Sequence, residues 1–307
     1  MSVLRQGLED YLSVRRSLGF KLERASHLLP DFIGFMEREG ATTVTTELAL
    51  AWATNTMNSV NWRAQRLDIV RGFARYLQAI DPNTEVPPAN LLPRRNDRAV
   101  PYIYTDAEIA SLMAAAQTRR RSIGRATHTT LIGLLAVTGM RVGEAIRLDR
   151  EDVDPEHRVL IVRSTKFGKS REVALHPSTI AALEAYSRCR DELMPHPISP
   201  SFFISQAGTR LIRSRVEYTY SYLVRQAGLQ RVSPRCRPRL HDFRHTFAVR
   251  TVLDWYRDGA DVAARLPLLS TYLGHVDPIS TYWYFSATPE LLALAAERLQ
   301  HGPGEFR

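Results

Sequence analysis

Two things the sequence has little of exclude whole classes of protein. Its 307 residues include two cysteines, Cys189 and Cys236, too few for a disulfide framework or for a zinc site built from cysteines alone. The longest candidate apolar run, residues 131–137, is far shorter than the roughly 20 residues that cross a bilayer. The N-terminal segment carries charges where a signal peptide needs an apolar stretch. We therefore predict a cytoplasmic protein with no membrane partner.

Lysine is also scarce, and arginine carries most of the positive charge. Lysine and arginine together number 41 against 32 acidic residues, a formal net charge of +9. Such a balance indicates a polyanionic partner, because neutralising phosphates releases counterions, although a solvated basic surface gives the same balance. Every basic side chain except Lys21, Lys166 and Lys169 is arginine, the residue suited to bidentate contact with phosphate.

The spacing of apolar residues predicts a helical N-terminal region. Four segments repeat apolar residues three and four apart, and Asp81-Pro82 ends the last of them. The segment from Pro82 to about Pro101 is proline-rich and aperiodic, as expected of a linker. We predict a helical domain at residues 1–92, a linker at 93–104 and a second domain at 105–307.

The second domain is predicted to be mainly helical with a small antiparallel β-hairpin. Thr105 and Glu108 fit a capping box that opens its first helix. The segments HRVLIVRS and REVALH have the β-branched content of strands. We find no internal repeat. The predicted helices cover residues 106–117, 127–137, 142–147, 177–192, 215–226, 241–253, 261–269 and 289–300.

Two segments of this domain place cations where they could meet a phosphate. The segment TGMRVGE presents Arg141 beside a helix N-terminus, which favours anions; the alternative is an arginine that simply pairs with Glu144. The predicted hairpin tip, RSTKFGKSR, is crowded with cations, including Lys166 and Lys169. It is either a finger that contacts phosphate or a solvated turn.

The segment HDFRH admits three interpretations. His241 and Arg244 are three residues apart, on one helix face, so both could reach one phosphate. His241 and His245 also have the spacing of the His-Glu-x-x-His zinc pattern. However, Asp242 is one methylene shorter than the glutamate of that motif, and Arg244 would set a cation beside the metal, so we predict no metal site. A structural pair of histidines is the third possibility.

A fourth segment, LGH, ends at His275 and is followed nine residues later by Tyr284. On their own, the aromatic residues 282–285 are typical of a packed core. Taken in order, however, the Arg, Lys, His-x-x-Arg, Gly-His and Tyr positions resemble those of the tyrosine recombinase (phage integrase) family. The resemblance covers essentially the whole chain.

The resemblance implies a catalytic set. Phe167 stands where glycine is common in the family, and Phe243 replaces a frequent leucine. Tyr282 competes with Tyr284 for the role of nucleophile, but residues two apart point to different sides of a helix, and the spacing from His275 favours Tyr284. The implied catalytic residues are Arg141, Lys166, His241, Arg244, His275 and Tyr284, with Glu144 and His245 as supporting residues that orient their neighbours.

The resemblance also implies a function. A member of this family cuts and rejoins DNA at specific sites through a covalent 3′-phosphotyrosine link, with no metal, ATP or other cofactor. Four protomers act on two sites through a Holliday junction, with a monomer or dimer in the absence of DNA and with accessory or sister recombinases as further partners. We expect a nucleoid-associated protein that integrates, excises or transposes a mobile element.

The same resemblance suggests residues for DNA binding and assembly. The N-terminal domain resembles the helical core-binding (SAM-like) domain of the family. The C-terminal helix 289–300 docks on a neighbouring protomer in this family, or packs on its own domain. The candidate DNA contacts are Arg63, Arg66, Arg71, Arg75, Lys169 and Arg171.

Two alternatives remain open from the sequence. A type IB topoisomerase-like nicking-closing enzyme would use the same chemistry, although the separate helical domain argues against it. An accessory DNA-binding protein that has lost catalysis is the second, and the complete set of candidate catalytic residues argues against that.

Overall fold

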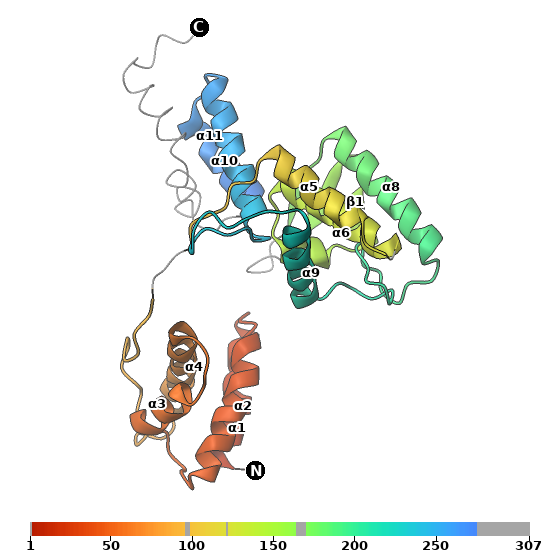
Figure 1. The fold of residues 1–307 in the computed structure, drawn as a ribbon. Helices are drawn as coiled ribbons and strands as arrows, with labels where there is room; N and C mark the ends of the chain where they lie inside the picture. The colour runs from red at the N-terminus through yellow and green to blue at the C-terminus, as the bar shows by residue number, and fades with distance from the viewer. Residues whose placement is uncertain (1, 96–98, 121, 164–169, 275–307) are drawn as a thin grey trace, which may run out of the picture. The chain divides into compact units, whose positions relative to one another are not determined.

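The computed structural model describes residues 2–95, 99–120, 122–163 and 170–274. The chain separates into two compact units, Met1–Asp97 and Arg98–Arg307 (Figure 1). This division falls inside the segment 93–104 for which the sequence predicts a linker, while the predicted domain boundaries themselves stay predictions. Each unit buries an apolar core of its own.

The first unit is a bundle of helices that bury one apolar face each. Three of them are preceded by a residue whose hydroxyl accepts from a backbone N–H of the first turn, namely Ser2, Thr45 and Ser59. Phe32 and Phe73 are fully buried at the centre. The helices are α1 (Val3–Ser17), α2 (Glu23–Arg38), α3 (Thr46–Thr54) and α4 (Val60–Gln78).

Helices also dominate the second unit. The predicted capping box at its first helix is present: Thr105 Oγ1 accepts from the N–H of Glu108, and the Glu108 carboxylate accepts from the N–H of Thr105. The helices are α5 (Asp106–Gln117), α6 (Ser122–Thr138), α7 (Val142–Arg147), α8 (Pro177–Leu193), α9 (Arg213–Gln226), α10 (Asp242–Arg257) and α11 (Val262–Leu273), with a short 3₁₀ turn η1 (Arg150–Asp152).

A three-stranded antiparallel sheet lies within this unit, in the order β1 (Val153–Asp154), β2 (Val159–Val162), β3 (Arg171–Ala174). In the register of the last two strands, Val162 stands opposite Arg171. Residues opposite each other, and residues two apart on one strand, share a face of the sheet. Arg171 therefore shares the face of Val162 and Val173, both of which are buried.

The predicted fold class is confirmed: the described chain is mainly helical with a small antiparallel sheet. The helix expected at residues 127–137 begins earlier, at Ser122, and the helix predicted at 289–300 lies outside the described residues. Within the described ranges, no helix is both long and apolar enough to cross a membrane.

The chain enters the second unit before Thr105. Tyr104 is 1% exposed and stacks on Phe243 of α10, with ring centroids 4.5 Å apart. Its backbone N–H donates to Oγ1 of Thr246 at 3.0 Å. A residue inside the predicted linker thus packs against α10, the helix that carries Arg244.

Candidate active site

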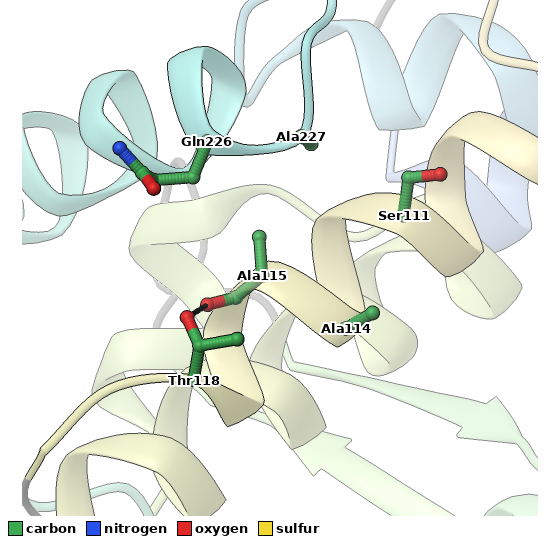
Figure 2. Close-up of a pocket in the computed structure, with 6 residues that line it drawn as sticks. All are labelled: Ser111, Ala114, Ala115, Thr118, Gln226 and Ala227. Atoms are coloured by element: carbon green, nitrogen blue, oxygen red, sulfur yellow. Dashed lines mark hydrogen bonds between the residues drawn. The ribbon is translucent and has the colours of Figure 1, made fainter.

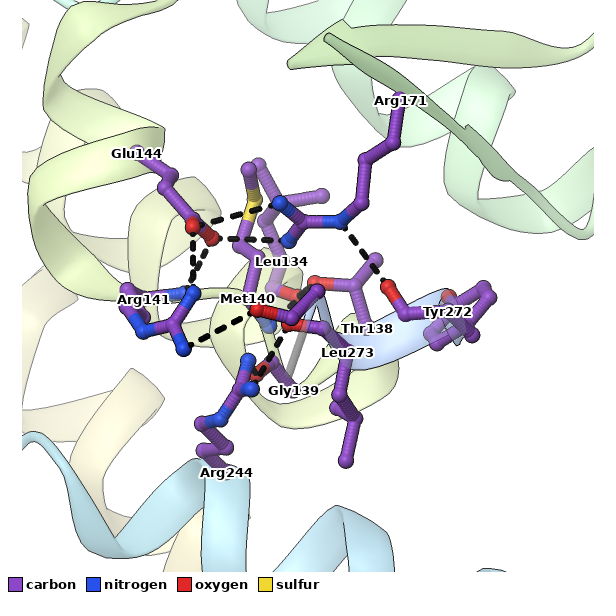
Figure 3. A network of polar contacts seen from close by, with 11 residues as sticks. Leu134, Thr138, Gly139, Met140, Arg141, Glu144, Arg171, Arg244, Tyr272 and Leu273 are labelled. Carbon is purple, nitrogen blue, oxygen red and sulfur yellow. Dashed lines mark hydrogen bonds and ion pairs between the residues drawn. The ribbon is translucent and has the colours of Figure 1, made fainter. Parts of the chain in front are cut away.

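The carboxylate of Glu144 is the centre of a polar network in the second unit (Figure 3). Its side chain is 3% exposed. From Arg141, the backbone N–H donates to Oε2 at 2.9 Å and Nη1 donates to Oε1 at 2.8 Å. From Arg171, Nη1 donates to Oε1 at 3.2 Å and Nη2 to Oε2 at 2.9 Å. Each carboxylate oxygen therefore accepts two N–H groups, which fills its hydrogen-bonding capacity.

These contacts keep Glu144 charged. Burial by itself would raise the pKa of the carboxyl group. The hydrogen bonds and positive charges of Arg171 and Arg141 outweigh burial and lower the pKa to about 2. The ionised carboxylate thus holds two guanidinium groups in fixed positions at neutral pH. Arg141 remains accessible, since its side chain is 40% exposed.

The C-terminal end of α11 binds the same arginines. The last carbonyl groups of a helix have no partner within the helix, and the dipole gives this end a partial negative charge. Here the carbonyl groups of three consecutive residues each accept from a different guanidinium (Figure 3). Tyr272 accepts from Arg171 (2.9 Å), Leu273 from Arg244 (2.7 Å) and Gly274 from Arg141 (3.3 Å).

Arg244 also ties α11 to the turn that precedes α7. Its side chain belongs to α10 and is almost fully buried, with the residue 1% exposed. Besides its bond to Leu273, it donates through Nη1 to the carbonyl of Gly139 at 3.0 Å. Segments more than 100 residues apart in sequence therefore meet at one guanidinium.

Two glycines make these turns possible. Gly139 and Gly274 have φ values of +60° and +67°, a region that side chains rarely adopt. Space excludes a side chain as well. A Cβ atom on Gly139 would lie 2.6 Å from Cδ1 of Phe247, and one on Gly274 would lie 2.8 Å from Nη1 of Arg171.

His241 lies immediately before α10 and keeps an exposed edge. Its ring is perpendicular to that of His245, with centroids 5.0 Å apart, and His245 is buried. Crowding by the surrounding protein, followed by the positive charges of Arg244 and Arg141, lowers the pKa of His241 to about 4. The ring is thus neutral near pH 7 and can donate one hydrogen bond and accept another.

The structure places some of the predicted site residues close together, and it shows that one further residue is part of the same network. It brings together Arg141, Glu144, His241 and Arg244, and it adds Arg171, which the sequence suggested only as a DNA contact. The signal for an inward Arg171 was its alternation with the apolar residues 173 and 175. Lys166, Lys169, His275 and Tyr284 lie outside the described residues.

Comparison with known proteins identifies the family. Residues 103–290 match the phage integrase family. The chain belongs to this family. It is 44% identical, over 98% of both chains, to y4rB of Sinorhizobium fredii, whose name classes it as an integrase or recombinase. It is 30% identical to the tyrosine recombinase XerD of Caulobacter vibrioides, over 75% of this chain and 72% of that one.

The protein is therefore a site-specific recombinase, and the resemblance predicted from its motifs is confirmed. Its fold is similar to that of the Tn1549 transposon integrase solved in complex with transposon right end DNA. The TM-score is 0.59 at 19% identity, over 96% of this chain and 99% of that one.

The arginines of α4 that the sequence suggested for DNA binding contact their own unit. Arg66 donates to the carbonyl of Trp52 at 3.0 Å and stacks over its ring at 3.8 Å. Arg63 and Arg71 donate to carbonyl groups of the loops that flank the helix. Arg75 is exposed. Their contact with DNA stays a prediction.

A hollow of about 350 Å³ lies between α5 and the end of α9 of the recombinase (Figure 2). Its lining has small or uncharged side chains, so it offers no cation to a phosphate. None of its lining residues belongs to the Glu144 network. The lining residues are Ser111, Ala114, Ala115, Thr118, Gln226 and Ala227.

Proposed function

We propose that this recombinase cuts and rejoins DNA through a covalent bond between Tyr284 and a 3′-phosphate. The observation that supports this most is the convergence of Arg141 and Arg244 on the end of α11, where Arg141 is also held by the buried carboxylate of Glu144. The charges of both arginines also act on His241. That helix end directly precedes His275 in the sequence. The network contains three guanidinium groups, of which two bind the carboxylate of Glu144 and the third binds backbone carbonyls, so its net charge is positive and suited to a phosphodiester.

The cleavage step exchanges one phosphorus–oxygen bond for another. The phenolic oxygen of Tyr284 attacks phosphorus as the bond to the 5′ oxygen breaks. Lys166 supplies a proton to the departing 5′ oxygen, and neutral His241 accepts the tyrosine proton or hydrogen-bonds the phosphate. Rejoining is the reverse step, in which a 5′-hydroxyl attacks the phosphotyrosine. The bond energy is retained in that link, so the cycle needs no ATP.

The positive groups act on the transition state. Attack on phosphorus gathers negative charge on the non-bridging oxygens. Arg141 and Arg244 stabilise that charge with donors that are already held in place, and His275 adds a hydrogen bond. Glu144 orients Arg141 by its two contacts with that residue. These groups do the work that a divalent metal does in other phosphoryl-transfer sites, so we expect activity in chelator.

We further propose that four protomers join two double-stranded DNA sites and exchange strands through a Holliday junction. A role in moving a mobile element is supported by the similarity to y4rB and to an integrase whose structure contains transposon DNA. The net charge of +9 is consistent with a DNA partner. Sister recombinases or accessory proteins are further candidate partners.

A nicked suicide substrate tests the covalent step. The DNA comes from the locus that encodes the chain and is nicked close to the cleavage position, so the short cleaved fragment diffuses away and the covalent complex accumulates. Wild type, Tyr284→Phe and Tyr282→Phe are compared in EDTA on a denaturing gel. We expect a DNA-shifted band for wild type and for Tyr282→Phe, and none for Tyr284→Phe.

Other outcomes would contradict the proposal in distinct ways. A band lost only with Tyr282→Phe would move the nucleophile by two residues. A band that requires added Mg²⁺ would contradict the metal-independent chemistry. Tight binding with no covalent complex in any variant would favour an accessory DNA-binding protein. Relaxation of plasmids that lack a target site would favour a topoisomerase.

A further inference from the structure

Arg171 links three separate segments of the recombinase. It is the first residue of β3, and it donates through Nη1 and Nη2 to Glu144 of α7. Through Nε it donates to the carbonyl of Tyr272 in the last turn of α11 at 2.9 Å. Its side chain is 12% exposed. A guanidinium that binds one carboxylate through two hydrogen bonds and a carbonyl through a third has little freedom to move toward a separate ligand.

The sheet register explains why this arginine points inward. Arg171 shares its face with Val162 and Val173, and both of those side chains are buried. A charged group on the core face of a sheet is strongly unfavourable unless it is paired. Glu144 is the buried carboxylate that meets this requirement. The register of β3 therefore places the Arg171 cation where it pairs with Glu144.

Gly274 provides the space that Arg171 occupies. A Cβ atom at residue 274 would lie 2.8 Å from Nη1, 3.0 Å from Cζ and 3.3 Å from Nε of Arg171. The guanidinium thus lies close against the backbone of the turn that ends α11. The next residue in the sequence is His275.

We propose that Arg171 is a positioning residue for strand cleavage, acting through Glu144 to fix Arg141 and through Tyr272 to fix the end of α11. This inference rests on the proposed function, because it requires Arg141 to act on the scissile phosphate. Arg171 and Arg141 both bind the Glu144 carboxylate. Arg171 is nearly buried, whereas the side chain of Arg141 stays accessible to substrate. The competing role for Arg171 is the direct DNA contact that the sequence suggested.

A double-mutant cycle separates these roles. Arg171→Met is made in the wild-type background and in the Glu144→Gln background, and single-turnover cleavage of the suicide substrate is measured alongside DNA affinity at several salt concentrations. We expect Arg171→Met to slow cleavage about 30- to 100-fold in the wild-type background, since small displacements of catalytic groups have effects of this size. In the Glu144→Gln background the same change should slow cleavage several-fold less, because the route through Glu144 is already weakened and the contact with Tyr272 is the main one left to lose.

Measuring DNA affinity distinguishes a positioning role from a general loss of structure, because an unfolded variant would bind DNA more weakly. We expect the dissociation constant of Arg171→Met to stay within about threefold of wild type, with an unchanged salt dependence. Loss of a phosphate contact would instead lower the slope of log K against log salt by about 0.9. Arg210→Met is the matched control, because Arg210 also bonds to one carboxylate, of Asp149, and one carbonyl, of Ile146. It should cleave within about threefold of wild type.

Each remaining outcome has a defined meaning. A full effect of Arg171→Met in both backgrounds, or a reduced salt slope, would overturn the positioning role in favour of direct contact. Equal losses in Arg171→Met and Arg210→Met would also overturn it. If Arg171→Met does not fold, Arg171→Lys keeps the charge without the fork and should show the same dependence on Glu144. A wild-type chain that forms no covalent complex would refute the proposed function, whereas an active wild type with an equally active Arg171→Met refutes this inference alone.

Discussion

The arginines of α4 and those around α11 all donate to backbone carbonyl groups. Those of α4 bind separate places, whereas those around α11 bind one helix end. In the first unit, Arg66 donates to the carbonyl of Trp52 in α3 and stacks on its ring, while Arg71 donates to carbonyl groups of the loop after α4. In the second unit, three arginines from three elements donate to three consecutive carbonyl groups at one helix end. Two of these three also share the carboxylate of Glu144.

The contacts of the α4 arginines are independent of one another, whereas the contacts around α11 depend on one another. An arginine that pins a loop to its own helix can be removed with a local effect. An arginine that binds the same carboxylate or the same helix end as others cannot, because its loss changes the position of the rest. Convergence on one helix end, more than burial or the number of hydrogen bonds, marks the arginines around α11 as the candidate active site.

Removing the most buried member of the converging set gives the largest expected effect. Arg244→Lys replaces a planar fork by a single ammonium, which cannot reach the carbonyl groups of Gly139 and Leu273 and also serve a phosphate. We expect cleavage of the suicide substrate to fall at least about 10³-fold, the scale of losing a donor to transition-state charge. The same change at Arg66 should alter cleavage by no more than a few-fold.

Folding has to be matched in this comparison. Circular dichroism and DNA affinity should show that Arg244→Lys is folded before the rates are compared. Losses of similar size in Arg244→Lys and Arg66→Lys would mean that convergence does not identify the active site, and that the two sets of arginines are equivalent.

Replacing glycine by alanine at two positions gives a second, smaller test of whether the contacts around α11 matter for cleavage. Gly274 and Gly259 have φ values of +67° and +70°, so alanine strains both by a similar amount, about 1 kcal/mol. A Cβ atom at residue 274 meets the guanidinium of Arg171, while nothing lies within 4 Å of one at residue 259. We expect both alanine variants to lose thermal stability, and Gly274→Ala to lose more, because it also displaces Arg171 from its ion pair with Glu144.

Cleavage should distinguish the two variants. Gly274→Ala displaces Arg171 and should slow cleavage at least about tenfold more than Gly259→Ala does, since misplaced catalytic groups lower rates steeply. Cleavage rates that follow the melting temperature in both variants would show that the turn at residue 274 matters only for stability.

Local signals predicted the elements well, and long-range contacts account for what was missed. The bounds predicted for 106–117 and 142–147 agree with α5 and α7, because the capping box at Thr105 and the turn at Gly139 are encoded within a few residues. Strand β1 spans two residues, too few to show a period of two. Tyr104 was assigned to a linker because its partners, Phe243 and Thr246, are about 140 residues away.

The candidate site shows the same division. The residue types of Arg141, His241 and Arg244 and their order along the chain pointed to phosphate chemistry. Nothing local predicts that Arg244 meets the carbonyl groups of residues 139 and 273. The sequence suggested Arg171 as a candidate DNA contact at the end of a cation-rich hairpin, although its alternation with Val173 was a signal for the inward face. Tertiary packing decided which way that side chain points.

The smallest effects are expected from the arginines of α4, where independence predicts additivity. Arg66→Ala and Arg71→Ala should each lower the free energy of unfolding of the first unit by about 1 kcal/mol, because each removes hydrogen bonding to backbone carbonyls outside α4. The two share none of their acceptors among the described contacts, so the double variant should equal the sum within about 0.5 kcal/mol. Exposed Arg75→Ala is the control and should change stability by less than about 0.5 kcal/mol. Urea denaturation followed by tryptophan fluorescence measures all four variants, and a coupling energy clearly above about 0.5 kcal/mol would show that the α4 arginines act as a unit after all.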